Sequence, residues 1–405
     1  MAMARKALVI GGGIIGVTSA YALARDGWQV RLIERESDVA RGASLGNGRQ
    51  LSYSHTNALG NPRMLPQIPR LLMGCDEAFR LSLRPDLSFI TWLLRLLGNS
   101  TPAAYRKNTL ETLALADQSR DAMERLLSRH AIEFDRRKVG KLVILRSDNE
   151  VRAARESMEM KKRAGLDQVL LDAHEASDVE PALAQAAEPI AAALYAPGDE
   201  TGDCNAFARE LCTLAQVEHG LQLTTGAAAQ SIERGRDGIR ITLSNGEEIA
   251  TDLVVVANGH DANRLLRPLG HPLPIEPMKG YSFTAPHGNA PPRISITDSK
   301  RRIVFTNIGD RMLVAGIAEI GALDLQVDPV RLASVKRVAH ASLPEAAIYS
   351  ESDEGWAGYR PLTPNSQPIT RLLERGIAVN SGHGMLGWTL AMGSAERLSD
   401  IVANT

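Results

Sequence analysis

A glycine-rich loop near the N-terminus constrains the fold of this chain more than any other feature. The apolar run Ala7–Ile10 is typical of a short buried strand, and the loop Gly11–Gly16 follows it at once. Good helix formers fill much of residues 17–25, and Trp28–Ile33 is typical of a second strand that ends at Glu34. The order of strand, glycine loop, helix, strand and acid predicts a βαβ unit.

This loop also predicts a dinucleotide site. Gly11 permits a tight turn, Gly13 lets the backbone approach a pyrophosphate, and Gly16 allows the helix to pack close to the strand. The free N–H groups at the start of the helix favour phosphates, and a carboxylate at Glu34 can accept both ribose hydroxyls. The pattern leaves FAD and NAD open, and a glycine-rich turn without a ligand is the alternative. The candidate cofactor residues in this unit are Gly11, Gly13, Ile14, Ile15, Gly16, Glu34 and Arg35.

Composition excludes several classes of protein. The 405 residues include 46 Lys plus Arg and 47 Asp plus Glu, whereas a dedicated nucleic-acid binder usually has a strong basic excess. The nine His and three Cys show no paired helical His spacing and no C-x-x-C pattern, so we expect no metal site. No run approaches the roughly 20 apolar residues of a membrane span, and too few residues precede Ala7 for a signal peptide. We therefore expect a globular protein of the cytoplasm.

The rest of the chain alternates between helical and strand-like regions. Residues 57–187 are mostly helical in pattern, with a strand-like segment at Lys141–Leu145, and residues 272–318 are rich in strands. Leu253–Ala257 is a continuous apolar run typical of a buried parallel strand. Glycines return at residues 376–384, before a helix expected over Leu386–Val402. Because nucleotide-binding signals occur at both ends and in the middle, we expect two interleaved domains.

Two further patterns have simpler explanations. Gly42–Gly46 matches G-x-S-x-G, but a hydrolase nucleophile elbow must connect a strand directly to a helix. Mostly polar residues separate this match from the strand that ends at Glu34. The basic runs Arg136–Lys138 and Lys161–Arg163 are flanked by acids, which indicates solvated helix faces.

Several longer stretches, in the same order along the chain, carry a resemblance to a known family. They are Ser44-x-x-Asn47 with Gln50-Leu51-Ser52, Arg84–Ser88, Glu200–Cys204, Lys279–Ser282, Ala315-Gly316-x-Ala318-Glu319, Trp356–Pro364 and Gly382–Thr389. On these residues the chain resembles the bacterial FAD-dependent D-amino acid dehydrogenases of the small-subunit type. These belong to the broader D-amino acid oxidase/glycine oxidase family, and the resemblance runs nearly end to end.

The resemblance implies an α/β fold with an α+β second domain. A Rossmann-like FAD-binding domain would consist of residues 1–60, 196–270 and 355–405. It would interleave with a substrate-binding, or cap, domain of antiparallel sheet plus helices, formed by residues 61–195 and 271–354.

The resemblance also implies further cofactor residues. Ala229 would meet the adenine through its backbone, and the C-terminal segment would present N–H groups and a helix N-terminus to the flavin pyrimidine ring. Met385 replaces an expected Thr, and Arg49 replaces a small residue. Some relatives bind flavin through a Cys in this segment; no Cys follows Cys212, so we expect non-covalent FAD. The added candidates are Ala43, Ser44, Asn47, Gln50, Leu51, Ser52, Ala229, Ala257, Gly259, Gly382, Gly384, Met385, Leu386, Gly387, Trp388 and Thr389.

The implied reaction is the oxidative deamination of a D-amino acid to a 2-oxo acid and ammonia, by hydride transfer from the α carbon to flavin N5. Arg360 matches the family's carboxylate-anchoring Arg, and an ordinary surface Arg after a strand is the alternative. Tyr281 would cover or hydrogen-bond the substrate, or else pack within a sheet. His55 would line the pocket, or else be an ordinary loop residue.

Other functions stay open from the sequence. They are a dehydrogenase of a cyclic or secondary amino acid such as D-hydroxyproline or proline, a nicotinamide-dependent dehydrogenase, and a catalytically silent flavin-binding protein. For a dehydrogenase, we expect electrons to pass to a quinone or respiratory acceptor. The apolar stretch Ile90–Leu97 predicts either a buried helix or a peripheral contact with the inner face of the cytoplasmic membrane.

Overall fold

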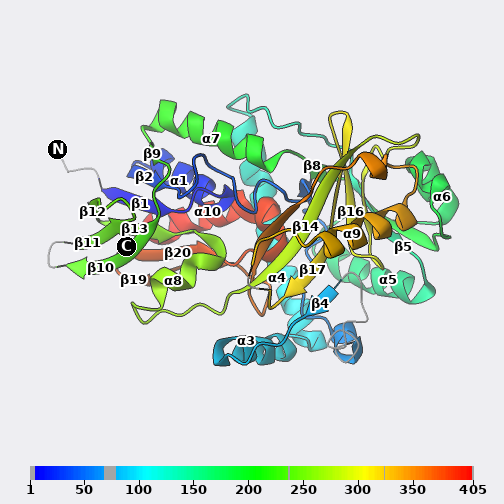
Figure 1. Ribbon diagram of the computed structural model, residues 1–405, viewed down its shortest axis with the longest axis horizontal. Coiled ribbons are helices and arrows are strands. Elements are labelled where there is room, and N and C mark those ends of the chain that lie inside the picture. Colours follow the sequence, from blue (N-terminus) through cyan, green and yellow to red (C-terminus); the bar gives the residue numbers. More distant parts are fainter. Residues whose placement is uncertain (1–4, 68–78, 236–237, 323, 404–405) are drawn as a thin grey trace.

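The computed structural model describes residues 5–67, 79–235, 238–322 and 324–403, which gather around two large sheets (Figure 1). The first sheet has six strands in the order β19-β20-β13-β1-β2-β9. All neighbours pair in parallel except β19 and β20. The strands are β1 (Lys6–Ile10), β2 (Gln29–Ile33), β9 (Gln222–Thr224), β13 (Leu253–Val256), β19 (Ile369–Glu374) and β20 (Ile377–Ser381).

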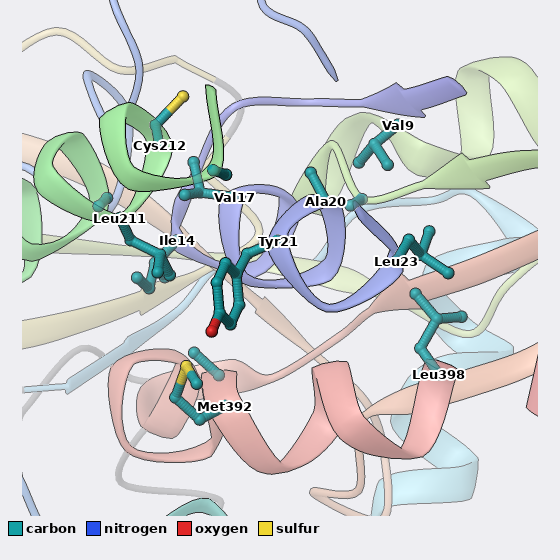
Figure 2. Close-up of a cluster of buried hydrophobic side chains, with 14 of the residues drawn as sticks. Val9, Ile14, Val17, Ala20, Tyr21, Leu23, Leu211, Cys212, Met392 and Leu398 are labelled. Carbon is teal, nitrogen blue, oxygen red and sulfur yellow. The ribbon is translucent and has the colours of Figure 1, made fainter. Parts of the chain in front are cut away.

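Three helices cover one face of this sheet: α1 (Ile14–Arg25), α7 (Cys204–His219) and α10 (Gly387–Ala403). Figure 2 shows the apolar side chains of α1 lying between the other two helices, with Tyr21 directed towards Met392 and Leu23 near Leu398. Because both faces of the sheet are covered, β1 is apolar almost throughout. The predicted βαβ unit is confirmed.

A smaller antiparallel sheet covers the opposite face. It consists of β10 (Ala229–Gly235), β11 (Gly238–Leu243) and β12 (Glu248–Thr251), and α8 (Ala262–Leu266) packs beside it. The predicted hairpin turn at Asn245-Gly246 joins β11 to β12. Gly246 has a φ of 84°, which a side chain would disfavour.

The second large sheet has nine strands and lies on the other side of the molecule (Figure 1). Its order is β18-β14-β17-β16-β15-β5-β7-β6, with β4 paired to β17. Most pairs are antiparallel, as expected, but β15 pairs with β5 and β17 with β4 in parallel. The strands are β4 (Phe79–Leu81), β5 (Lys141–Leu145), β6 (Val169–Leu171), β7 (Ala192–Ala196), β14 (Glu276–Pro286), β15 (Ser295–Asp298), β16 (Ile303–Ile308), β17 (Arg311–Ile320) and β18 (Trp356–Leu362).

The remaining helices begin at side chains that accept first-turn N–H groups. Such caps are Asp86 for α3 (Leu87–Gly98), Thr101 for α4 (Pro102–Leu127), Ser147 for α5 (Asp148–Lys162), Asp172 for α6 (Ala173–Val179) and Asp328 for α9 (Pro329–Ser342). A two-stranded pair, β3 (Gln50–Leu51) with β8 (Glu200–Thr201), lies where the two large sheets meet. Short 3₁₀ turns occur at Pro62–Gln67, Pro181–Gln185, Gly259–Asp261, Tyr349–Glu351 and Gly384–Leu386.

Two elements lie differently from the expected domain ranges. β18 falls within 355–405 but pairs with β14 of the nine-stranded sheet. α4 falls within 61–195, yet its Leu115 and Met123 belong to the same buried cluster as Leu23 of α1. We therefore propose a division in which β18 joins the second domain and α4 joins the first.

Gly393 explains how closely α4 approaches α10. A Cβ at this position would lie 2.8 Å from the carbonyl oxygen of Leu115 and 2.8 Å from the amide nitrogen of Ser119. The backbone of α4 therefore packs directly on α10, which only glycine permits.

We expect Gly393→Ala to lower the free energy of unfolding by about 1–3 kcal/mol, because the added methyl group overpacks this helix crossing. Intrinsic helix propensity alone would favour Ala by about 1 kcal/mol, so the expected effect opposes propensity. Gly98→Ala in α3 is the matched control, since a Cβ there meets nothing within 4 Å. Thermal and denaturant unfolding measure both. An unchanged or raised stability of the Gly393 variant would contradict the close packing.

Candidate active site

A cavity of about 900 Å³ takes its wall from both large sheets. This volume is at the upper end of the roughly 300–1,000 Å³ typical of ligand sites. One end is formed by the glycine loop and the ends of β2 and β13, and the other by β5 and β14–β18. The acids that line the cavity, Glu34, Glu36 and Asp261, lie at the first end, whereas the second end contributes Lys141, Arg302 and Arg360.

The glycine loop leaves the N-terminus of α1 facing the cavity. Its N-cap, Gly13, has no side chain to accept the first-turn N–H groups. Ser44 Oγ accepts only the N–H of Ile14, at 3.0 Å. Gly11 has a φ of 103°, and a Cβ on Gly16 would lie 1.7 Å from the carbonyl oxygen of Gly11. The loop therefore has the close approach and the open helix end that a pyrophosphate requires.

The acid at the end of β2 is held in place by the backbone. Glu34 Oε2 accepts the N–H of Gly12 at 2.5 Å, and Oε1 accepts that of Glu36 at 2.9 Å. Arg35 also lines the cavity and pairs with Asp261 at 2.6 Å. Ala229 lines the same end, and its carbonyl accepts a hydrogen bond from Arg264 at 2.7 Å.

The segment Gly46–Ser52 is held from the nine-stranded sheet by side-chain hydrogen bonds. Ser282 donates to the carbonyl of Gly46 at 3.0 Å, and Thr306 donates to that of Gly48 at 2.9 Å. Gln50 donates to Ser295 at 2.6 Å and accepts from Lys141 at 2.9 Å. These contacts fix the part of the chain that lines the middle of the cavity.

The C-terminal segment closes the cavity from the other side. Gly382 and Gly384 have φ values of 84° and 56°, which turn the chain from β20 into α10. Thr389, in the first turn of α10, accepts the N–H of Ser52 at 3.0 Å. Trp388 donates to the carbonyl of Gly202 at 3.2 Å and packs against Phe207. Met385, the departure from the family pattern, lines the cavity and is 55% exposed.

Arg360 projects from β18 into the cavity wall. A Cβ on Gly280 would lie 2.4 Å from its guanidinium carbon, so the side chain lies flat on glycine backbone. Its Nη1 is 3.4 Å from the carbonyl oxygen of Ile317, a β-branched residue with an unusual φ of 55°. Among the described residues Arg360 has no carboxylate partner. Desolvation lowers the pKa of Arg360 to about 10.

The other two catalytic candidates differ in their placement. Tyr281 is fully buried within the nine-stranded sheet, donates to Glu319 at 3.1 Å and does not line the cavity. The prediction that Tyr281 meets the substrate is therefore not supported. Side chains alternate between the two faces of β14, and the ring of Tyr281 lies on the face that packs into the core of the second domain. His55 does line the cavity, and its Nδ1 lies 3.1 Å from Asp199 Oδ2. Burial and the charge of Lys141 lower the pKa of His55 to about 4.

Sequence reasoning missed a buried polar cluster beside His55. Lys141 lines the cavity, Asp199 is fully buried, and Lys161 is 1% exposed with its Nζ 2.7 Å from the carbonyl oxygen of Ser54. The expected solvated face at Lys161–Arg163 is thus wrong for Lys161, because α5 turns that side chain inward. The signal was a Lys at the head of an otherwise apolar strand, Lys141–Leu145.

Most of the predicted cofactor residues come together in this cavity. Gly16 and Leu51 are the two that do not line it: Gly16 packs on the loop, and the Leu51 side chain is buried in the core. Those that line it are Gly11, Gly13, Ile14, Ile15, Glu34, Arg35, Ala43, Ser44, Asn47, Gln50, Ser52, Ala229, Ala257, Gly259, Gly382, Gly384, Met385, Leu386, Gly387, Trp388 and Thr389. Ser44 acts as a helix cap for α1, not as a nucleophile.

Four buried polar atoms in the cavity wall have no hydrogen-bond partner within the described ranges. They are His55 Nε2, Asn258 Oδ1, Tyr359 Oη and His383 Nδ1. Buried polar groups are rarely left unpaired, so these atoms indicate that a polar ligand completes the site. Together with the open end of α1 and Glu34, they fit a bound dinucleotide such as FAD.

The described part of the chain offers no group of three His, Cys, Asp or Glu residues that could hold a metal ion. In the same residues, no helix is both long and apolar enough to cross a membrane. Cys204 and Cys212 are buried and do not line the cavity, and Cys75 lies outside the described residues.

Known proteins with similar sequences and folds are flavoproteins and amino acid oxidoreductases. The profile of the family "DAO: FAD dependent oxidoreductase" matches residues 6–401. A D-amino acid dehydrogenase of Dechloromonas aromatica (strain RCB) is 33% identical over 410 residues, covering 98% of this chain and 97% of that protein. One of Paramagnetospirillum magneticum (strain ATCC 700264 / AMB-1) is 34% identical over 404 residues, covering 98% and 95%.

Solved structures share the fold at lower identity. Glycine oxidase from Bacillus cereus ATCC 14579 has a TM-score of 0.75 at 19% identity and covers 99% of this chain and 95% of its own. L-proline dehydrogenase from P. horikoshii has a TM-score of 0.74 at 20% identity, with coverages of 100% and 94%. The predicted α/β class with a second, α+β unit is confirmed.

Proposed function

The chain belongs to the DAO family of FAD-dependent oxidoreductases, and on this premise we propose that it is a dehydrogenase that oxidises D-amino acids to 2-oxo acids and ammonia. The names of the curated relatives support the substrate class. The observation that carries the proposal is Arg360, a guanidinium in the cavity wall without a carboxylate partner among the described residues. An α-carboxylate is the ligand that such a group fits.

The protein's part in the reaction is to bind and orient the substrate. FAD, when bound, accepts the hydride that leaves the α carbon. Arg360 offers two parallel N–H groups, which fix the plane of the carboxylate. Gly280 and the carbonyl of Ile317 hold the guanidinium in turn. With the carboxylate fixed, the Cα–H bond keeps few orientations, and the imino acid formed then hydrolyses to the 2-oxo acid and ammonia.

The charge of Arg360 suits this role at neutral pH. A pKa of about 10 keeps the guanidinium protonated at pH 7. Because the guanidinium is partly buried and has no carboxylate partner among the described residues, an incoming carboxylate supplies the interaction that the free site lacks. Removing one partner of such a buried pair is far more costly than breaking an exposed ion pair.

The helix α3 supports a peripheral contact with a membrane that would supply a quinone acceptor. One face of α3 is buried through Phe89, Trp92 and Leu96. The opposite face carries Leu87 and Leu94, which are 78% and 63% exposed, and Ile90 between them. Figure 1 shows α3 at the edge of the molecule, below the nine-stranded sheet. An exposed apolar helix face is typical of a surface that meets a partner or a lipid headgroup region.

Anaerobic mixing with amino acids tests the function directly. We expect D-amino acids to bleach the visible absorbance of the holoprotein faster than L-amino acids, glycine or sarcosine. Faster bleaching by proline or hydroxyprolines would favour a cyclic substrate. An absence of bleaching by every D-amino acid would refute the proposal.

The FAD should be held without a covalent bond, since neither Cys204 nor Cys212 lines the cavity. Acid precipitation should therefore release all of the FAD into the supernatant.

Replacing Arg360 should remove carboxylate recognition and leave FAD in place. We expect Arg360→Ala to lower kcat/KM by a factor that corresponds to about 3–5 kcal/mol of lost transition-state stabilisation. Arg360→Lys should lose less of this stabilisation, but it should not match Arg because Lys lacks the planar fork. Arg371→Ala in β19, an exposed Arg that does not line the cavity, is the control. The measurement is kcat/KM for a D-amino acid and for the amine without its carboxylate. A variant that keeps its preference for the acid would show that another residue binds the carboxylate.

Polar residues on the outer face of α3 should weaken membrane binding. We expect the double variant Leu87→Ser, Leu94→Ser to lose most of its co-sedimentation with anionic vesicles while its turnover with a soluble artificial acceptor stays unchanged. The matched control is Val217→Ser, Val330→Ser, which changes two exposed valines elsewhere. Equal vesicle binding by both double variants would contradict the α3 contact.

A further inference from the structure

A buried lysine with only neutral hydrogen-bond acceptors lies in the cavity wall. Lys141 begins β5 and is 6% exposed. Its Nζ donates to Gln50 Oε1 and to Ser52 Oγ, both at 2.9 Å. Desolvation favours the uncharged amine, and it lowers the pKa of Lys141 to about 8. Among the described residues, no carboxylate is therefore hydrogen-bonded to this ammonium.

Asp199 does not provide that charge by a direct contact. It is the acid whose field acts on Lys141, but its carboxylate accepts hydrogen bonds from Ser54 N at 2.8 Å and from His55 Nδ1 at 3.1 Å. Lys161, a second buried cation, also lies within the field of Asp199. One anion is thus shared between two lysines, and only Lys141 lines the cavity.

The N-terminus of α10 adds positive potential at the same place. Thr389, in the first turn of α10, accepts the N–H of Ser52, while Lys141 donates to the hydroxyl of Ser52. A helix N-terminus carries roughly half a positive elementary charge. Two positive sources therefore converge on Ser52, whereas the acids of the cavity lie at the opposite end with Glu34.

We propose that Lys141 stabilises the negative charge that bound FAD gains on reduction, and so raises the reduction potential of the cofactor. A hydride carries one proton and two electrons, so the ring system that accepts it gains one negative charge. A cation held in a water-poor wall stabilises this charge more strongly than it would in water. The role rests on the proposed function, because it concerns electron uptake in the same cavity.

The test compares holoproteins that differ in charge at this position. Lys141→Met and Lys141→Gln remove the charge, and Lys141→Arg keeps it. The two-electron midpoint potential is measured at pH 7 by gradual chemical reduction beside a reference dye. We expect the midpoint potential of both neutral variants to be lower than that of the unmodified protein. At a given potential, their ratio of reduced to oxidised FAD should fall at least about tenfold, which corresponds to about 30 mV. In the Arg variant, this ratio should stay within threefold of that of the unmodified protein.

Lys161→Met is the matched control, since it removes a buried lysine of the same cluster that does not line the cavity. We expect its ratio of reduced to oxidised FAD, at a given potential, to stay within threefold of that of the unmodified protein. An unchanged potential in Lys141→Met, or an equal shift in Lys161→Met, would overturn the proposal. Loss of FAD from both neutral variants would also overturn it, in favour of a structural role for Lys141.

These potentials require no amino acid substrate. If the unmodified holoprotein bleaches with no D-amino acid, the proposed function fails, and the comparison of potentials still decides the role of Lys141. If D-amino acids are oxidised but the potentials of all variants agree, only the role of Lys141 fails. Sulfite affinity gives a second readout, because its binding also leaves negative charge on the ring.

Discussion

The segment Gly46–Ser52 is the structural link on which the site depends, because the nine-stranded sheet and α10, a helix packed on the six-stranded sheet, both hold it by hydrogen bonds. Ser282 and Thr306 of the nine-stranded sheet bind its backbone carbonyls, and Thr389 of α10 accepts its last N–H. A displacement of one sheet relative to the other would break several of these bonds at once. Each intramolecular hydrogen bond contributes about 1 kcal/mol, and an orphaned buried group costs more. The segment therefore sets how the cofactor end and the substrate end of the cavity face each other.

The acids of the cavity lie at one end only, and this arrangement matches the chemistry proposed for it. Glu34 lies beside the open end of α1, where ribose hydroxyls and phosphates would bind. Lys141 and Arg360 lie at the other end, on strands at different positions of the nine-stranded sheet. A substrate carboxylate and a cofactor that becomes more negative on reduction both favour cations there. Because Lys141 is buried and Arg360 is partly buried, each charge acts more strongly than on the open surface.

The buried groups also indicate where stability has been given up for function. Lys141, Lys161 and Arg360 all have pKa values lowered by desolvation, so their charged forms are unfavourable in the free protein. The left-handed backbone of Ile317 adds local strain beside Arg360. Such groups concentrate in functional sites, and here three of the four line the cavity.

The sequence by itself determined the local elements of the fold, and most of the cofactor residues that it predicted line the cavity. The βαβ unit, the β11–β12 hairpin and the C-terminal helix follow from patterns within a few residues, because strand burial, turn geometry and helix spacing are local properties. Arg360 was recognisable only through a resemblance to a family, since one Arg after an aromatic residue has no local signature. Tertiary structure alone decided that Tyr281 points into the sheet core, that α4 packs on α10 through Gly393, and that Lys141 faces Ser52. These outcomes depend on contacts between residues far apart in the chain, and strand register and helix rotation decide which side chain reaches the cavity.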